Sequence, residues 1–281
     1  MAVSEQELTS LAATHDIISL GMLADGVRRQ RHENRTTFLR VADVPVEGGP
    51  LSIAADAGEV RIVGVPASRA AALERVRTVA QLSGGRPLSA FSLADLEALA
   101  AREGVTLRAL LEELHAEGLE LVAEAPVDQL QDARRSIEEV NISGLALARL
   151  TVHQASADRL PLLKAVADLQ RTVAVIRAFA PLPRRVNPAV PTTGYDDVKH
   201  VALARVVVDN IASIQVDWSL YGPKLAQVAL TLGADDVDAV SADSETTEGR
   251  RRAPLEEIRR NIRAAGQEPI ERNGRFEHIS R

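Results

Sequence analysis

The chain has 281 residues, a formal net charge of −6 and no cysteine, which argues against a nucleic-acid surface and excludes a disulfide within the chain. Hydrophobic residues make up 46% of the sequence but aromatic residues only 2%, so we expect a globular core of aliphatic side chains. No stretch approaches the roughly 18 apolar residues of a membrane span, and the start of the sequence is not that of a secretory signal. We therefore expect a cytoplasmic protein.

Strands and helices are predicted to alternate along the first two thirds of the chain. Apolar residues at helical spacing predict one amphipathic helix over 4–31, followed by a short strand over 36–41. The apolar run VRIVGV at 60–65 is typical of a buried parallel strand. Further helices are expected over 69–82, 92–102, 106–118, 129–140 and 160–170, and further strands over 88–91, 119–123, 145–152 and 173–179.

The last third opens on a proline-rich segment, APLPRRVNPAVPTTG, which we interpret as a loop. Residues 241–252, SADSETTEGRRR, are polar and charged and are expected to be mobile. Helices are predicted over 195–210, from Gly222-Pro223-Lys224 to about 232, and over 254–265, with strands over 214–220 and, as a final strand or tail, 269–276. Such alternation implies parallel strands with right-handed crossovers, in a barrel or in a doubly wound sheet.

Two segments carry a resemblance to a known family. Residues 192–239 read TTGYDDVKHVALARVVVDNIASIQVDWSLYGPKLAQVALTLGADDVDA. This stretch closely resembles the C-terminal part of the radical S-adenosylmethionine (SAM) enzymes of the menaquinone (futalosine) pathway, the group of aminodeoxyfutalosine synthase, dehypoxanthine futalosine cyclase and deazaflavin (FO) synthase. The run HDIISLGMLADGVRRQRHENRTTFLRV is similar to the family's entry helix and first strand.

The resemblance implies an α/β fold of the TIM-barrel type, shortened or partial near its start, with a C-terminal helix and strand extension. It divides the chain into an entry helix (1–35), a barrel (36–240), a mobile linker (241–253) and a C-terminal helix and tail that pack on the barrel (254–281).

The cofactor residues of that family are missing. Its members hold a [4Fe–4S] cluster through a CxxxCxxC motif, and this chain has no thiolate to offer. Ala90-Phe91-Ser92 resembles a family segment that continues to a SAM-binding Glu, which is absent here, and the family's glycine-rich turn reads Ala123-Glu124-Ala125-Pro126. The six histidines lack metal-ligand spacing. We expect no cluster and no metal, and SAM binding is in doubt.

Three residues are candidate catalytic groups, because ligands of parallel barrels bind at the carboxyl ends of the strands. Asp217 either faces a ligand or pairs with a nearby arginine. Arg177 interrupts an apolar strand, so it either forms a buried ion pair or receives a carboxylate or phosphate. We expect these two side chains to face each other from consecutive strands. His153 matches the histidine of a G-H-V-E-T-like family loop, with a structural or a catalytic role.

Candidate substrate-binding residues lie nearby in the sequence. Gln215 shares the polar face of its strand with Asp217, and Trp218 follows them. Lys224 lies in the first turn of a helix, where free N–H groups bind anions. Asp235 and Asp236 could accept substrate hydroxyls, although both segments could equally be turns.

Two functions stay open. One is a cluster-less protein related to menaquinone biosynthesis, which binds a futalosine-like or chorismate-derived small molecule or assists a cluster-bearing paralogue, with a homo-oligomer also possible. The alternative is an enzyme of lyase or hydrolase type that performs non-radical acid/base chemistry with Asp217, Arg177 and His153. Neither nucleic acid nor a membrane is an expected partner.

Overall fold

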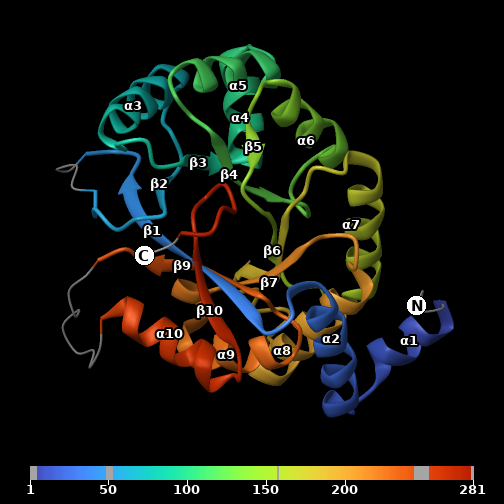
Figure 1. The fold of residues 1–281 in the computed structure, drawn as a ribbon. Helices are drawn as coiled ribbons and strands as arrows, with labels where there is room; N and C mark the ends of the chain where they lie inside the picture. Colours follow the sequence, from blue (N-terminus) through green and yellow to red (C-terminus); the bar gives the residue numbers. More distant parts are fainter. Residues whose placement is uncertain (1–4, 49–52, 157, 244–252, 280–281) are drawn as a thin grey trace.

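The structure, a computed structural model, describes residues 5–48, 53–156, 158–243 and 253–279. Its centre is a closed barrel of eight parallel strands surrounded by helices (Figure 1). The strands follow one another around the barrel in chain order, and β9 pairs with β1 to close it. They are β1 (Arg35–Pro45), β2 (Glu59–Val63), β3 (Leu88–Ser92), β4 (Leu121–Pro126), β6 (Leu150–Gln154), β7 (Ala178–Arg185), β8 (Ser213–Asp217) and β9 (Asp236–Ser241). The predicted TIM-barrel-like fold is confirmed, but the expectation of a partial barrel is wrong, because all eight strands are present and the barrel closes.

Two further strands extend the sheet. The short β5 (Ala146–Leu147) pairs with the first half of β4, and β6 pairs with its second half. The C-terminal β10 (Glu268–Arg272) pairs with the first half of β1, whereas β2 pairs with its second half. Strand β1 is therefore hydrogen-bonded along both edges.

The helices lie between successive strands and bury apolar faces against the barrel. They are α1 (Glu5–Ala13), α2 (Ile17–His32), α3 (Arg69–Leu82), α4 (Leu93–Glu103), α5 (Leu107–Ala116), α6 (Ala133–Ile142), α7 (Leu160–Val173), α8 (Gly194–Val207), α9 (Trp218–Thr231) and α10 (Pro254–Ala264). Local signals fix several starts: Thr106 accepts a hydrogen bond from Ala109 N, and Thr193 and Asp196 form a capping box. Within the described residues, no helix has the length and apolarity needed to cross a membrane.

The single helix expected over 4–31 is wrong, because α1 and α2 are separate. The side chain of Asp16 accepts hydrogen bonds from Ile18 N and Ser19 N and so begins α2 anew. The strand expected over 214–220 is too long for the same reason. Asp217 ends β8, and its carboxylate caps α9 by accepting from Leu220 N.

Two other strand predictions fail near the prolines and glycines. The strand expected over 173–179 is shifted: α7 continues to Val173, and β7 runs through Pro181 and Pro183, in the segment interpreted as a loop. Strand β9 was not predicted; its first residue, Asp236, was interpreted as a substrate contact or as part of a turn. The strand expected over 145–152 divides into β5 and β6. Most of the expected mobile segment, 244–252, lies outside the described residues, and the domain boundaries stay a prediction.

Candidate functional site

Four polar side chains, two carboxylates, an arginine and a histidine, form a chain of contacts at the carboxyl ends of four neighbouring barrel strands. His153 of β6 lies with Nε2 3.3 Å from Glu124 Oε1 of β4. Arg184 of β7 lies with Nε 2.8 Å from Glu124 Oε2 and donates through Nη1 to Asp217 Oδ2 of β8 at 3.1 Å. We call these four residues the mouth cluster. They lie where parallel barrels bind ligands.

Neighbouring groups hold the mouth cluster in place. Asp217 Oδ1 accepts from Ser219 Oγ at 2.8 Å and from Leu220 N at 3.0 Å, so one carboxylate both caps α9 and binds Arg184. The carboxylate of Asp128 accepts the backbone N–H of His153 at 2.8 Å. These contacts restrict the side chains before any ligand arrives.

The electrostatics keep Glu124 ionised. Burial alone would raise the pKa of Glu124, but the hydrogen bond with His153 and the charge of Arg184 outweigh it and lower this pKa to about 2. Asp95 in the first turn of α4 shows the opposite behaviour, because burial and then the negative charge of Glu124 raise the pKa of its carboxyl. A carboxylate with the pKa of Glu124 is a weak base at neutral pH.

A second charged group fills the barrel interior. Arg61 of β2 donates to both carboxylate oxygens of Asp238 on β9, at 3.0 and 3.2 Å, and Arg149 also bonds to Asp238. Glu59 accepts from Arg61 at 2.8 Å and from Ser89 Oγ at 2.7 Å. We call Glu59, Arg61, Arg149 and Asp238 the interior cluster. The two arginines lower the pKa of Asp238 far below its usual range despite complete burial.

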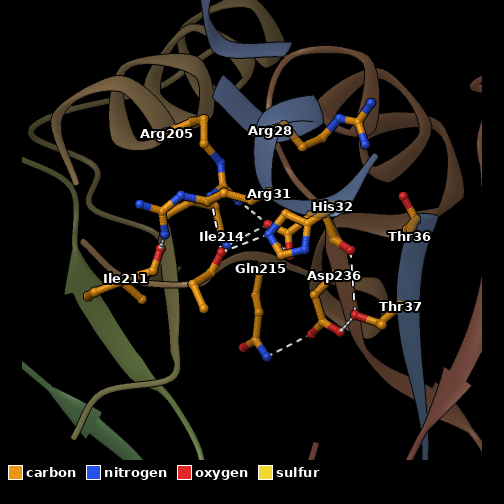
Figure 2. A network of polar contacts seen from close by, with 12 residues as sticks. Arg28, Arg31, His32, Thr36, Thr37, Arg205, Ile211, Ile214, Gln215 and Asp236 are labelled. Atoms are coloured by element: carbon orange, nitrogen blue, oxygen red, sulfur yellow. Dashed lines mark hydrogen bonds and ion pairs between the residues drawn. The ribbon is translucent and has the colours of Figure 1, made fainter. Parts of the chain in front are cut away.

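Gln215 and Asp236 lie at the amino end of the barrel, inside it. The Asp236 carboxylate accepts from Arg272 of β10 at 2.6 and 2.7 Å, from Gln215 Nε2 at 2.8 Å and from Thr37. Figure 2 shows the Gln215, Asp236 and Thr37 contacts. Thr37, Gln215 and Arg272 thus all donate to Asp236 at the end of the barrel away from the mouth, whereas Gln215 Oε1 has no hydrogen-bond partner among the described residues. Both residues lie away from the mouth cluster, and the substrate-binding role of Gln215 and Asp236 stays a prediction.

Asp235, directly before β9, belongs to a network with α2 and α8. Figure 2 labels His32, Arg205 and Ile214 of this network. Its carboxylate binds the fully buried Arg205, accepts from Ile214 N at 2.8 Å and lies 3.3 Å from His32 Nε2. Arg205 also donates to the Gly233 carbonyl at 2.8 Å. The predicted role of Asp235 in accepting substrate hydroxyls does not fit this buried position; the residue ties helices to the barrel.

Gly233→Ala is expected to destabilise the fold by about 2 kcal/mol through backbone strain and crowding. Gly233 has a φ of 108°, and an added Cβ would lie 2.9 Å from Arg205 Cβ and 3.0 Å from Ala24 Cβ. Urea unfolding measures the change. Gly26→Ala is the control, because Gly26 lies in α2 with open space around it, and this change should stabilise by about 0.5–1 kcal/mol. Equal effects of the two substitutions would contradict the argument.

Arg177 is not a member of the mouth cluster, so the expected contact between Arg177 and Asp217 is wrong. It precedes β7, is exposed and donates to the Arg275 carbonyl at 3.0 Å, at the amino end of the barrel. The partner of Asp217 is Arg184, at the other end of the same strand. Strand β7 lies further along the sequence than predicted, which explains why Arg184, and not Arg177, reaches Asp217.

Trp218 and Lys224 lie in different surroundings. Trp218 is buried in the hydrophobic core, 5% exposed, and so packs against apolar side chains. Lys224 is exposed on α9, just after a kink at Gly222, whose φ is 73°. The pattern of the sequence missed Glu124, Arg184 and the whole interior cluster. A pattern in the sequence could have indicated the interior cluster. Charged residues two positions apart, Glu59 and Arg61 on β2 and Asp236 and Asp238 on β9, share one face of their strand.

A cavity of about 330 Å³ opens beside the mouth cluster. Its wall includes Arg184 and Arg185 from the end of β7, Asn187, and Leu220 and Tyr221 from α9. Two cations and an amide, on a wall that also carries apolar side chains and the hydroxyl-bearing Thr192 and Tyr221, suit a ligand that carries a carboxylate.

The fold and this site define a parallel (β/α) barrel protein whose polar site lies in the mouth of the barrel. Methylornithine synthase (PylB) has the same fold with a TM-score of 0.67 and 12% identity, over 96% of this chain and 94% of that chain. The FeFe-hydrogenase maturase HydG from Carboxydothermus hydrogenoformans gives a TM-score of 0.64 at 12% identity, over 95% and 76%. At such identities the likeness concerns the fold alone.

Residues 181–281 match the family model of the CofH/MqnC C-terminal region. Over 211 residues the chain is 25% identical to the cyclic dehypoxanthine futalosine synthase of Streptomyces coelicolor, covering 66% of this chain and 53% of that protein. Over 114 residues it is 34% identical to the aminodeoxyfutalosine synthase of Thermus thermophilus, covering 36% and 30%. The chain thus spans about half or less of the length of these relatives.

This cysteine-free chain is therefore similar to the futalosine-type enzymes named above, with a family-model match over residues 181–281, and the resemblance stated from residues 192–239 is confirmed. The ligands of a [4Fe–4S] cluster are thiolates, which this chain cannot supply. Within the described residues, no group of three or more His, Asp or Glu is arranged to hold a metal ion. The donor set does not fit the cluster of the family.

Proposed function

We propose that this chain is a cluster-less relative of the futalosine-pathway enzymes that binds a futalosine-like or chorismate-derived small molecule in the mouth of its barrel. The relatives named above support the pathway, and the missing thiolates argue for a role without a cluster of its own. The observation that carries the proposal is the cavity beside Arg184 and Arg185. Chorismate-derived compounds carry the carboxylate that such arginines bind.

Unsatisfied polar atoms in the barrel support a bound ligand. Thr151 and His153 alternate along β6, and Arg149 directly precedes this strand at the same spacing, so the three share its inward face. Arg149 Nε, Thr151 Oγ1 and His153 Nδ1 are buried and have no hydrogen-bond partner within the described part of the chain. Buried polar atoms are normally paired, so a polar ligand or water at these atoms would remove a cost of about 1–3 kcal/mol each.

The arrangement favours binding over acid/base catalysis. Glu124 and Asp217 are held in ion pairs with Arg184, and the low pKa of Glu124 makes it a poor proton acceptor. Arg177, which the acid/base alternative requires, lies at the other end of β7. The three groups of that alternative therefore do not share one ligand atom.

Isothermal titration calorimetry with futalosine, aminodeoxyfutalosine and chorismate-derived enolpyruvyl compounds tests the proposal. Arg185→Gln should weaken binding about 10-fold or more, because one charge-assisted hydrogen bond is worth roughly 1.5–3 kcal/mol. Arg177→Gln is the matched control: it removes another exposed arginine, at the far end of the barrel, and should leave the Kd unchanged.

Three outcomes would contradict the proposal. Tightly bound iron, or binding that requires SAM, would show that a cofactor site survives. Equal losses in the two arginine variants would place the ligand outside the mouth. Failure of every compound to bind would favour a role in assisting a cluster-bearing paralogue.

A further inference from the structure

A second cavity, of about 320 Å³, lies outside the barrel between α1, α8 and the segments that lead into α7 and α8. Its wall combines aliphatic side chains with three nitrogen-bearing ones, and none of these three belongs to the mouth or interior cluster. The aliphatic residues are Ala12, Leu160, Val190, Pro191 and Leu203, and the nitrogen-bearing ones are Arg159, Lys199 and His200. The volume falls within the range of small-molecule sites.

His200 is the unusual member of this wall. The side chain is 3% exposed, and Nδ1 is buried with no hydrogen-bond partner among the described residues. The ring is hydrogen-bonded to the Pro181 carbonyl, which requires an N–H on the ring. Burial, followed by the charge of Arg159, lowers the pKa of His200 to about 3, so the ring is neutral at pH 7. A neutral ring that donates through one nitrogen can only accept at the other.

Arg159 and Lys199 supply positive charge without a carboxylate in direct contact within the described chain. Arg159 Nη1 donates to the Asp196 carbonyl at 3.2 Å, and Lys199 Nζ to the Ala12 carbonyl at 2.8 Å. The carboxylates on the wall have other partners: Asp158 accepts from Leu160 N, and Asp196 from Thr193. Burial lowers the pKa of Arg159, and the negative charges of Asp197 and Asp196 oppose this shift.

We propose that this cavity binds a small hydroxylated carboxylate with an aliphatic body. Its carboxylate binds Arg159 and Lys199, its hydroxyl donates to His200 Nδ1, and its carbon skeleton packs against the aliphatic wall. This cavity adjoins the one under the proposed function, with which it shares Val190, Pro191 and Thr192, but Arg159, Lys199 and His200 line only this one. The two ligands bind different charged groups, so either site can exist without the other. One ligand would supply a donor for His200 Nδ1 and an anion for Arg159.

The 3- and 4-hydroxycyclohexanecarboxylates are suitable probes. Calorimetry should show binding of at least one isomer, and cyclohexanecarboxylate, without the hydroxyl, and the hydroxylated carboxamide, without the charge, should each bind at least 5-fold more weakly. Arg159→Gln should weaken carboxylate binding about 10-fold, whereas Arg185→Gln in the barrel mouth should not change it. Loss in Arg185→Gln with no change in Arg159→Gln would place the probe in the mouth and overturn the proposal.

His200→Leu should reduce binding of the hydroxylated probe to the level of cyclohexanecarboxylate. Because a buried substitution can impair folding, the wild-type protein provides a second readout. With ¹⁵N-labelled histidine, the Nδ1 resonance of one neutral ring should move as the probe is added, because that nitrogen becomes a hydrogen-bond acceptor. Unchanged resonances of all histidines at saturating probe, or no binding of any isomer, would overturn the proposal.

Discussion

Asp238→Ala is expected to lower the free energy of unfolding by about 3–5 kcal/mol, among the largest effects of a single substitution in this chain. The carboxylate is 2% exposed and binds Arg61 through both oxygens and Arg149 through one. After its removal Arg61 keeps Glu59, but Arg149 loses its carboxylate partner inside the barrel. A buried charge without a partner is far more costly than the ion pair that held it.

A double-mutant cycle separates this pairing from a general loss of packing. Asp238→Ala combined with Arg149→Leu should be less destabilising than the sum of the single changes by about 1–3 kcal/mol, measured by urea unfolding. Asp168→Ala is the matched control, since Asp168 pairs with Arg171 on the surface of α7, where both side chains are exposed. That change should cost less than about 1 kcal/mol. Strict additivity in the cycle would contradict the interpretation.

Acid is expected to destabilise the protein through the mouth cluster. The pKa of Glu124 is about 2 in the folded state against 4.5 for the free group, so the ionised form contributes about 3 kcal/mol above pH ~5. This contribution is lost as the pH falls from about 5 towards 2. Glu124→Gln removes it, so the gap in unfolding free energy between wild type and variant should narrow by about 2 kcal/mol from pH 6 to pH 3.

Asp95→Asn provides a comparison of opposite sign. The folded state raises the pKa of Asp95, so its ionised form opposes folding at neutral pH, and this cost disappears as the pH falls below the unfolded pKa. The neutral amide should therefore make the protein more stable at pH 7 and should leave it little changed at pH 3. Parallel stability curves for wild type and both variants between pH 6 and pH 3 would contradict the assignment of charges at the mouth.

The helices and the first strands follow from the sequence because they bury apolar residues at regular spacing. The helix expected over 69–82 coincides with α3, and the run at 60–65 overlaps β2. Strand β9 was not recognised because its inward residues, Asp236 and Asp238, are charged and follow Gly233, which is typical of a turn. Strand β7 was displaced because its prolines indicate a loop, whereas the barrel accommodates them beside a register shift.

The site was predicted only in part, because the partners of its ion pairs come from different strands and depend on how these strands are aligned in the barrel. Asp217 and His153 do lie at the mouth, as expected from their positions at strand ends. The sequence offers several arginines near Asp217, and the choice between Arg177 and Arg184 depends on where β7 begins. Glu124 appeared only as a departure from a glycine-rich turn, and nothing local indicates that His153 and Arg184 converge on it.

The pairing of β1 with β10 has a consequence for how the protein is made. Arg40 and Glu271, which bond at 2.9 Å on these two strands, are 231 positions apart in the sequence. A nascent chain on the ribosome therefore holds the amino-terminal half of β1 with one edge open until β10 has emerged. Such distant contacts slow folding and expose the unpaired edge to other chains. We expect nascent chains that stop short of β10 to depend on chaperones, and completed chains to be released from them.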